Sequence, residues 1–120
     1  MPGRPAPPTE KRCMTKVTIQ SGACGFTTTV TVDKTKNGKM TLTVETPCEM
    51  VKKMCGEIGV LDRFAPLTGF SNNPVYLAAG KHLKHVACPV PSGILKAVEV
   101  EAGLNTEKDA TIHFDKKEQR

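Results

Sequence analysis

An Asn-Gly pair, Asn37-Gly38, lies between two segments in which threonine alternates with apolar residues. The flanking segments, FTTTVTVD at 26–33 and KMTLTVET at 39–46, have the period of two that is typical of half-buried β-strands. Asn-Gly is the strongest short signal for a tight hairpin turn. An earlier segment, TKVTIQ at 15–20, alternates in the same way. The sequence therefore predicts an antiparallel meander of three strands with one apolar face.

A first helix is expected directly after the meander. The stretch TPCE at 46–49 matches a capping box, with Thr46 at the N-cap, proline at the first helical position and Glu49 at the third. The helix should end near Gly59, and its buried stripe includes Met54 and Cys55. A short helix around 60–65 would follow it.

Two more helices are predicted in the second half of the chain. Asn73-Pro74 starts the first of them, which should fray by about Lys84. Pro91 starts the other, which runs to Gly103 as a C-terminal stop.

The last apolar alternation, ATIHFD at 110–115, predicts a closing strand with Ile112 and Phe114 directed inward. The expected fold class is α+β, with a four-stranded, mainly antiparallel sheet and about three helices packed on one face. The sheet would consist of the three-strand meander plus the C-terminal strand. We expect a disordered, proline-rich N-terminal extension at 1–13, a single domain at 14–115 and a charged tail at 116–120.

Composition and charge exclude several classes of function. The formal net charge of the 120 residues is +5, but residues 1–16 carry three of these excess charges and residues 115–120 carry one. A nearly neutral domain with no Trp and one Tyr argues against nucleic-acid binding, because a protein that binds nucleic acid needs a basic surface and stacking side chains.

No apolar run approaches the ~18 residues of a membrane-spanning helix. Five cysteines, an odd number, without an export signal favour a reducing, cytoplasmic location.

Three of the cysteines are predicted to lie at one end of the sheet. Cys24 belongs to the loop after the first strand, and Cys48 follows the third strand. Since adjacent antiparallel strands are under ~5 Å apart, these two loops share an edge. Cys48 in the first turn of a helix and Cys88 just before another would gain thiolate stabilisation from the helix dipoles. Glycines on both sides of the Ala23-Cys24 pair leave room beside that sulfur.

A metal site is the principal hypothesis for these thiols. Cys24, Cys48, Cys88 and His82 would be the ligands, with His85 as an outer or substitute ligand, because four N and S ligands suit zinc or an iron-sulfur cluster. Alternatively, Cys48 attacks and Cys24 resolves in thiol redox or sulfur-carrier chemistry. The simplest interpretation is three unrelated buried thiols, with His82 as a core residue and His85 near a helix end.

A third hypothesis is a metal-free interaction domain. Lys81, Lys84 and Lys96 could form a basic rim for an acidic protein partner, although such lysines are usually only a solvated face. The sequence favours a non-catalytic role, because it contains no P-loop, no dinucleotide-binding glycine motif and no G-x-S-x-G elbow. The oligomeric state stays open.

The chain resembles a family of short uncharacterised proteins of anaerobic bacteria and archaea in CGFTTTVTV, TPCEMVKKMCGEIGVLD, NPVYLAAGKHLKHVACPVPSGILKAVEVEAGL and DATIHF. The resemblance covers nearly all of residues 14–114 and implies no activity. It implies cysteines at the positions of Cys24, Cys48 and Cys88 and a histidine at that of His85. The resemblance also implies that other members have cysteine at the position of His82. Exchange of histidine for cysteine preserves the capacity to bind a metal.

Overall fold

The computed structural model describes residues 14–116. Four strands form one antiparallel sheet in the order β1-β2-β3-β4: β1 (Met14–Gln20), β2 (Thr27–Lys34), β3 (Lys39–Glu45) and β4 (Val60–Asp62). Three α-helices complete the domain: α1 (Glu49–Ile58), α2 (Pro74–His82) and α3 (Val90–Glu101). The predicted α+β class with a four-stranded antiparallel sheet and three helices is thus confirmed. The expected extension at 1–13 and most of the tail at 116–120 lie outside the described residues, and the proposed domain limits stay predictions.

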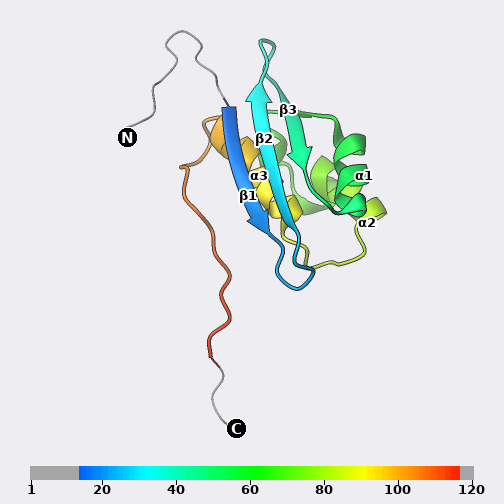
Figure 1. Cartoon of the computed structure of the whole chain (residues 1–120). Helices are drawn as coiled ribbons and strands as arrows, with labels where there is room; N and C mark the ends of the chain where they lie inside the picture. The colour runs from blue at the N-terminus through cyan, green and yellow to red at the C-terminus, as the bar shows by residue number, and fades with distance from the viewer. Residues whose placement is uncertain (1–13, 117–120) are drawn as a thin grey trace.

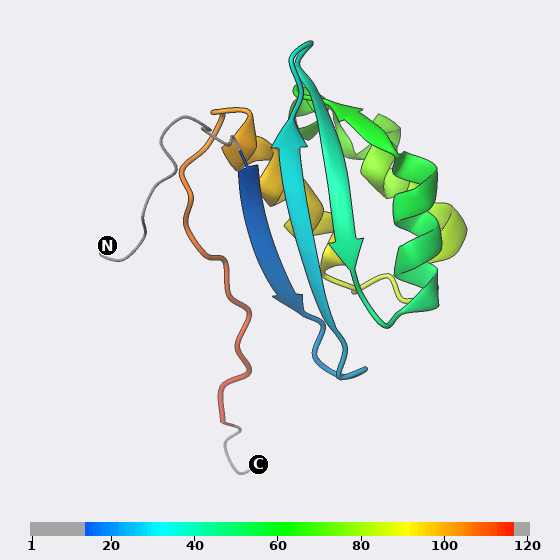
Figure 2. The same ribbon diagram turned by 45° about the horizontal axis from the view of Figure 1, so that its top comes forward.

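The meander forms as its alternation requires. Thr18 pairs with Thr29 on one face of the β1–β2 ladder, and Val17 pairs with Val30 on the other. Gly38 takes a positive φ of 82° in the β2–β3 turn, a conformation that favours glycine. Figures 1 and 2 show that the helices leave the opposite face of the three long strands open.

The core lies between the apolar face of the sheet and the helices. Helix α3 packs against β1 and β2, whereas α1 and α2 pack against each other beside β3. The fully buried side chains of the core include Val30, Val32, Met40, Met54, Ile94 and Val98. The helices therefore cover the centre of the apolar face without any contribution from residues beyond α3, whereas Val17 on β1 is only partly buried.

The fourth strand is not the one expected from sequence. Residues 105–116 form no helix or strand, and the side chains of Ile112 and Phe114 are 87% and 92% exposed. The edge of β3 is instead occupied by Val60–Asp62, where a short helix around 60–65 was expected. This nearer segment pairs with β3 because Leu61 can then bury its side chain. The prediction of a C-terminal strand in the chain's own sheet is wrong.

Two helix starts differ in detail from the expectation. Helix α1 begins at Glu49 with Cys48 as its N-cap, so the capping box at Thr46 is wrong. Helix α2 begins as predicted, with the Asn73 side chain accepting a hydrogen bond from the Val75 N–H. Helix α3 begins at Val90, one residue earlier than expected.

Candidate functional site

Three connections that carry cysteines lie at the same end of the sheet. They are the β1–β2 loop at 21–26, the β3–α1 connection at 46–48 and the α2–α3 loop at 83–89. Figures 1 and 2 show all three at the lower end of the molecule, opposite the β2–β3 turn. The β1–β2 loop and the β3–α1 connection lie at the same end because β1 and β3 are both antiparallel to β2. The third joins them because α3 starts at this end and runs back across the sheet.

Threonine hydroxyls fix the backbone of Cys48. The Thr28 hydroxyl donates to Thr46 Oγ1 at 2.8 Å, and Thr46 Oγ1 accepts from the Cys48 N–H at 3.1 Å. Thr28 is 1% exposed, so this chain of bonds ties the start of α1 to the interior of β2. The same bonds explain why α1 begins at Glu49 and not directly after Thr46. The Thr46 side chain is bonded to Thr28 of β2, so the backbone becomes helical only after this residue.

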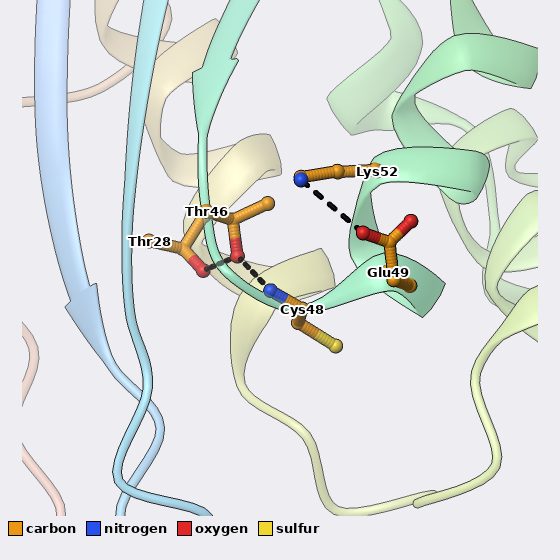
Figure 3. A network of polar contacts seen from close by, with 5 residues as sticks. All are labelled: Thr28, Thr46, Cys48, Glu49 and Lys52. Carbon is orange, nitrogen blue, oxygen red and sulfur yellow. Dashed lines mark hydrogen bonds and ion pairs between the residues drawn. The ribbon is translucent and has the colours of Figure 1, made fainter.

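The sulfur of Cys48 takes no part in that network. No side-chain bond caps α1, and the half-buried Cys48 side chain packs partly against the core. In Figure 3 this side chain points away from Thr28 and Thr46, toward the end where the α2–α3 loop runs. The sulfur is therefore free to face the other cysteine-bearing connections at this end of the sheet.

Cys24 occupies the most open of the three connections. The loop is a tight turn in which the Gly25 N–H donates to the Gly22 carbonyl at 2.8 Å. Both glycines have positive φ values, 85° and 76°. The Cys24 side chain is exposed between them, so its sulfur is accessible from solvent.

His85 and Cys88 belong to one turn of the α2–α3 loop. The Cys88 N–H donates to the His85 carbonyl at 3.1 Å. Cys88 is half-buried and packs partly against the core, whereas His85 is exposed. Cys88 precedes the first residue of α3 by two positions, near the positive end of the helix dipole, as the sequence suggested.

His82 lies elsewhere, against α1. Its Nε2 is 2.7 Å from Glu57 Oε1, and the Lys81 Nζ donates to Glu57 Oε2 at 2.8 Å. The hydrogen bonds from Lys81 and His82 lower the pKa of the Glu57 carboxyl. Because Glu57 is in the last turn of α1 and Cys48 is at its start, the two are separated by a rise of about 13 Å along the helix. The assignment of His82 as a ligand stays a prediction.

The fourth described cysteine, Cys55, behaves as a core residue. It packs partly against the buried cluster from within α1. Burial raises the pKa of its thiol to about 11, so the thiol stays protonated near neutral pH. An unreactive thiol of this kind is a suitable internal control for the other three.

The three lysines of the proposed basic rim come from different settings. Lys81 is paired with Glu57, and Lys84 is exposed in the α2–α3 loop. Lys96 lies on α3 beside an open groove whose lining includes Phe70 and Tyr76. The role of these lysines in partner binding stays a prediction.

In the part of the chain that the structure describes, no three His, Cys, Asp or Glu side chains form a group that could hold a metal ion. The fold thus brings the loops of Cys24, Cys48 and Cys88 to one end without closing a ligand set. The Glu57–His82 pair was not foreseen, because the two residues are 25 positions apart on different helices and neither local sequence signals the contact. The groove beside Lys96 was missed for the same reason.

The comparisons with known proteins identify a family but no activity. Residues 15–114 match the model of a family of unknown function, DUF6951. No curated protein and no solved structure matches the chain. None of the helices within residues 14–116 has the length and apolar character that crossing a membrane requires.

Proposed function

Because the chain belongs to a family of unknown function (DUF6951), which supplies no activity, we propose from its residues that it is a metal-binding domain. The ligands would be Cys24, Cys48 and Cys88, completed by one histidine. The observation that carries the proposal is the arrival of three cysteine-bearing connections at one end of the sheet. A reducing, cytoplasmic setting would keep these thiols available.

The surroundings of each thiol support this assignment. Cys48 is the N-cap residue of α1, and Cys88 lies two residues before the start of α3. Their partial burial against the core supplies a fixed base for a bound ion. The Cys24 side chain is exposed in a loop between two glycines, so a metal ion can reach its sulfur.

His85 suits the fourth position better than His82 in this arrangement. His85 shares a turn with Cys88 and is exposed. His82 is held by Glu57 at the far end of α1 from Cys48. Three thiolates and one imidazole form a ligand set that is typical of structural Zn²⁺, and an iron-sulfur cluster is the other cofactor that such thiols hold.

Metal binding would complete the folding of this end of the domain. Since no ligand set is closed among residues 14–116, the loops at 21–26 and 83–89 must move toward Cys48 when the metal binds. Ligand formation then contributes directly to folding stability. We therefore expect the metal to raise the melting temperature and to protect the amides of both loops from exchange.

Anaerobic purification followed by elemental analysis and an absorption spectrum tests this proposal. Zinc, or iron with sulfide and visible charge-transfer bands, would support a metal centre and identify it. Protein free of both metals that also binds neither when they are added back under reducing conditions would overturn it.

Thiol exchange is the second candidate function. It rests on the exposure of Cys24 and on the position of Cys48, a helix N-cap residue, at the same end of the sheet. The Cys48 thiolate would attack a partner's disulfide, forming a mixed disulfide and releasing one partner thiolate. The Cys24 thiolate would then attack the Cys48 sulfur, releasing the second thiolate and leaving a Cys24–Cys48 disulfide. Selective formation of that disulfide in oxidised glutathione, without metal, would favour this candidate.

A further inference from the structure

The C-terminal segment at 110–115 has the pattern of a strand but pairs with no strand among residues 14–116. Residues 110–115 alternate apolar and polar side chains, with Ile112 and Phe114 on one side of the pattern. Both are almost fully exposed, at 87% and 92%. The family match extends to residue 114, so this segment is a regular part of the family's domain. Two exposed apolar side chains at strand spacing indicate a surface that is covered by something else.

The sheet offers one long free edge. Within residues 14–116, β1 pairs with β2 on one side only, so the backbone groups on its other side are unpaired. Val17 and Ile19 point to the helix side of β1, and Lys16 to the open side. Val17 is only partly buried, so an added strand could cover it. An unprotected seven-residue edge is a template for pairing with another chain.

The direction of the segment favours a second copy as the partner. Figures 1 and 2 show that the chain after α3 runs past β1 in the same direction as β1, clear of the strand. A two-fold axis perpendicular to the strands reverses β1 in a second copy. The segment of one chain would then meet the partner's β1 antiparallel, and the exchange would be reciprocal and closed.

We propose that two copies of this chain form a dimer by exchanging residues 110–115, each segment adding an antiparallel strand to β1 of the other copy. One register satisfies both faces of the sheet. Phe114 would lie opposite Val17 and Ile112 opposite Ile19 on the helix side. Asp115 would then lie opposite Lys16 on the open side, pairing opposite charges. The eight residues at 102–109 can span up to about 26 Å, which allows the segment to cross to the partner.

Light scattering coupled to size-exclusion chromatography tests the proposal on the full chain under reducing conditions. Wild-type protein should have twice the 12.9 kDa chain mass. The double variant Ile112→Asp/Phe114→Asp should elute as a monomer that keeps its helix content by circular dichroism and still unfolds cooperatively, and only the strand signal of residues 110–115 should be lost. The control Val86→Asp changes an equally exposed apolar residue outside the pattern and should remain dimeric.

A charge exchange tests the register. Lys16→Glu and Asp115→Lys should each raise the dimer dissociation constant by roughly fivefold, and the double exchange should restore it. A monomeric wild type at 100 µM, as expected if the segment pairs with its own β1, would overturn the proposal. So would a dimer that the Ile112→Asp/Phe114→Asp variant leaves intact.

Discussion

Gly93 of α3 approaches Ile19 of β1 so closely that a Cβ built at residue 93 would lie 2.6 Å from Ile19 Cγ1. Ile19 is only 8% exposed and is β-branched, so its side chain has little freedom to move aside. The absence of a side chain at residue 93 is therefore what lets α3 lie directly on β1. Gly93 is the fourth residue of α3, so the contact lies in the first turn of this helix.

Substitution of Gly93 tests that contact. Gly93→Ala should lower the free energy of unfolding by about 1–3 kcal/mol, because overpacking of the helix–strand contact outweighs the gain in helix propensity. The matched control is Gly56→Ala in α1, where nothing lies within 4 Å of the added Cβ. That change should stabilise by about 0.5–1 kcal/mol. Urea unfolding monitored by circular dichroism measures both, and equal effects of the two changes would contradict the close approach.

The contact of Glu57 with Lys81 and His82 predicts a specific acid sensitivity. The lowered pKa of Glu57 means that its contribution to stability is present above its ordinary value of 4.5 and is lost as pH falls through the lowered value. Glu57→Gln should remove this part of the pH dependence. The melting temperatures of the wild type and of Glu57→Gln should therefore converge as the pH is lowered below 4.5. The exposed Glu45→Gln serves as the control, and a constant difference between wild type and Glu57→Gln at all pH values would contradict the prediction.

The cysteines should react with alkylating agents in a fixed order. Cys24 is exposed and should be modified first, whereas Cys55, with its pKa raised to about 11, should be modified last. Timed iodoacetamide labelling of the metal-free protein at pH 8, followed by peptide mass spectrometry, measures the order. Rapid labelling of Cys55 in the native protein would contradict the assigned burial.

The same raised pKa has a consequence for alkaline stability. The folded state favours the protonated Cys55 thiol, so this contribution is complete below pH 9.0 and is lost as pH rises toward about 11. Cys55→Ala should reduce the steepness of the alkaline loss in melting temperature.

Local sequence patterns predicted the meander and the helices because each of these elements is specified by its own residues. The alternation in 26–33 and 39–46 and the turn at Asn37-Gly38 suffice for a hairpin, and Asn73-Pro74 suffices for the start of α2. Helix α1 was misplaced at its start because the Thr46 hydroxyl bonds to Thr28 of β2. That contact depends on the tertiary fold and cannot be read from neighbouring residues.

The periodicity of the sequence could not predict which segments form the edges of the sheet. Strand β4 has only three residues, too few for a repeating pattern, and it forms because Leu61 fills a space beside Met40 of β3. Residues 110–115 have a clear strand pattern, but a pattern does not say which sheet a strand joins. For the candidate site, antiparallel topology sufficed to predict that the loops of Cys24 and Cys48 lie at the same end of the sheet. The contact of His82 with Glu57 could not be predicted in this way, because it depends on how α2 packs on α1.

Zinc titration of the reduced protein and its single-cysteine variants tests the central claim most directly. Wild-type protein should bind about one Zn²⁺ per chain and gain about 2.7 kcal/mol of stability at a hundredfold excess over the dissociation constant. Cys24→Ser, Cys48→Ser and Cys88→Ser should each weaken binding by roughly tenfold or more, while Cys55→Ser should bind as wild type does. Absence of both zinc and iron-sulfur binding in the wild type, or unchanged affinity in all three variants, would contradict the convergence of these cysteines on one metal centre.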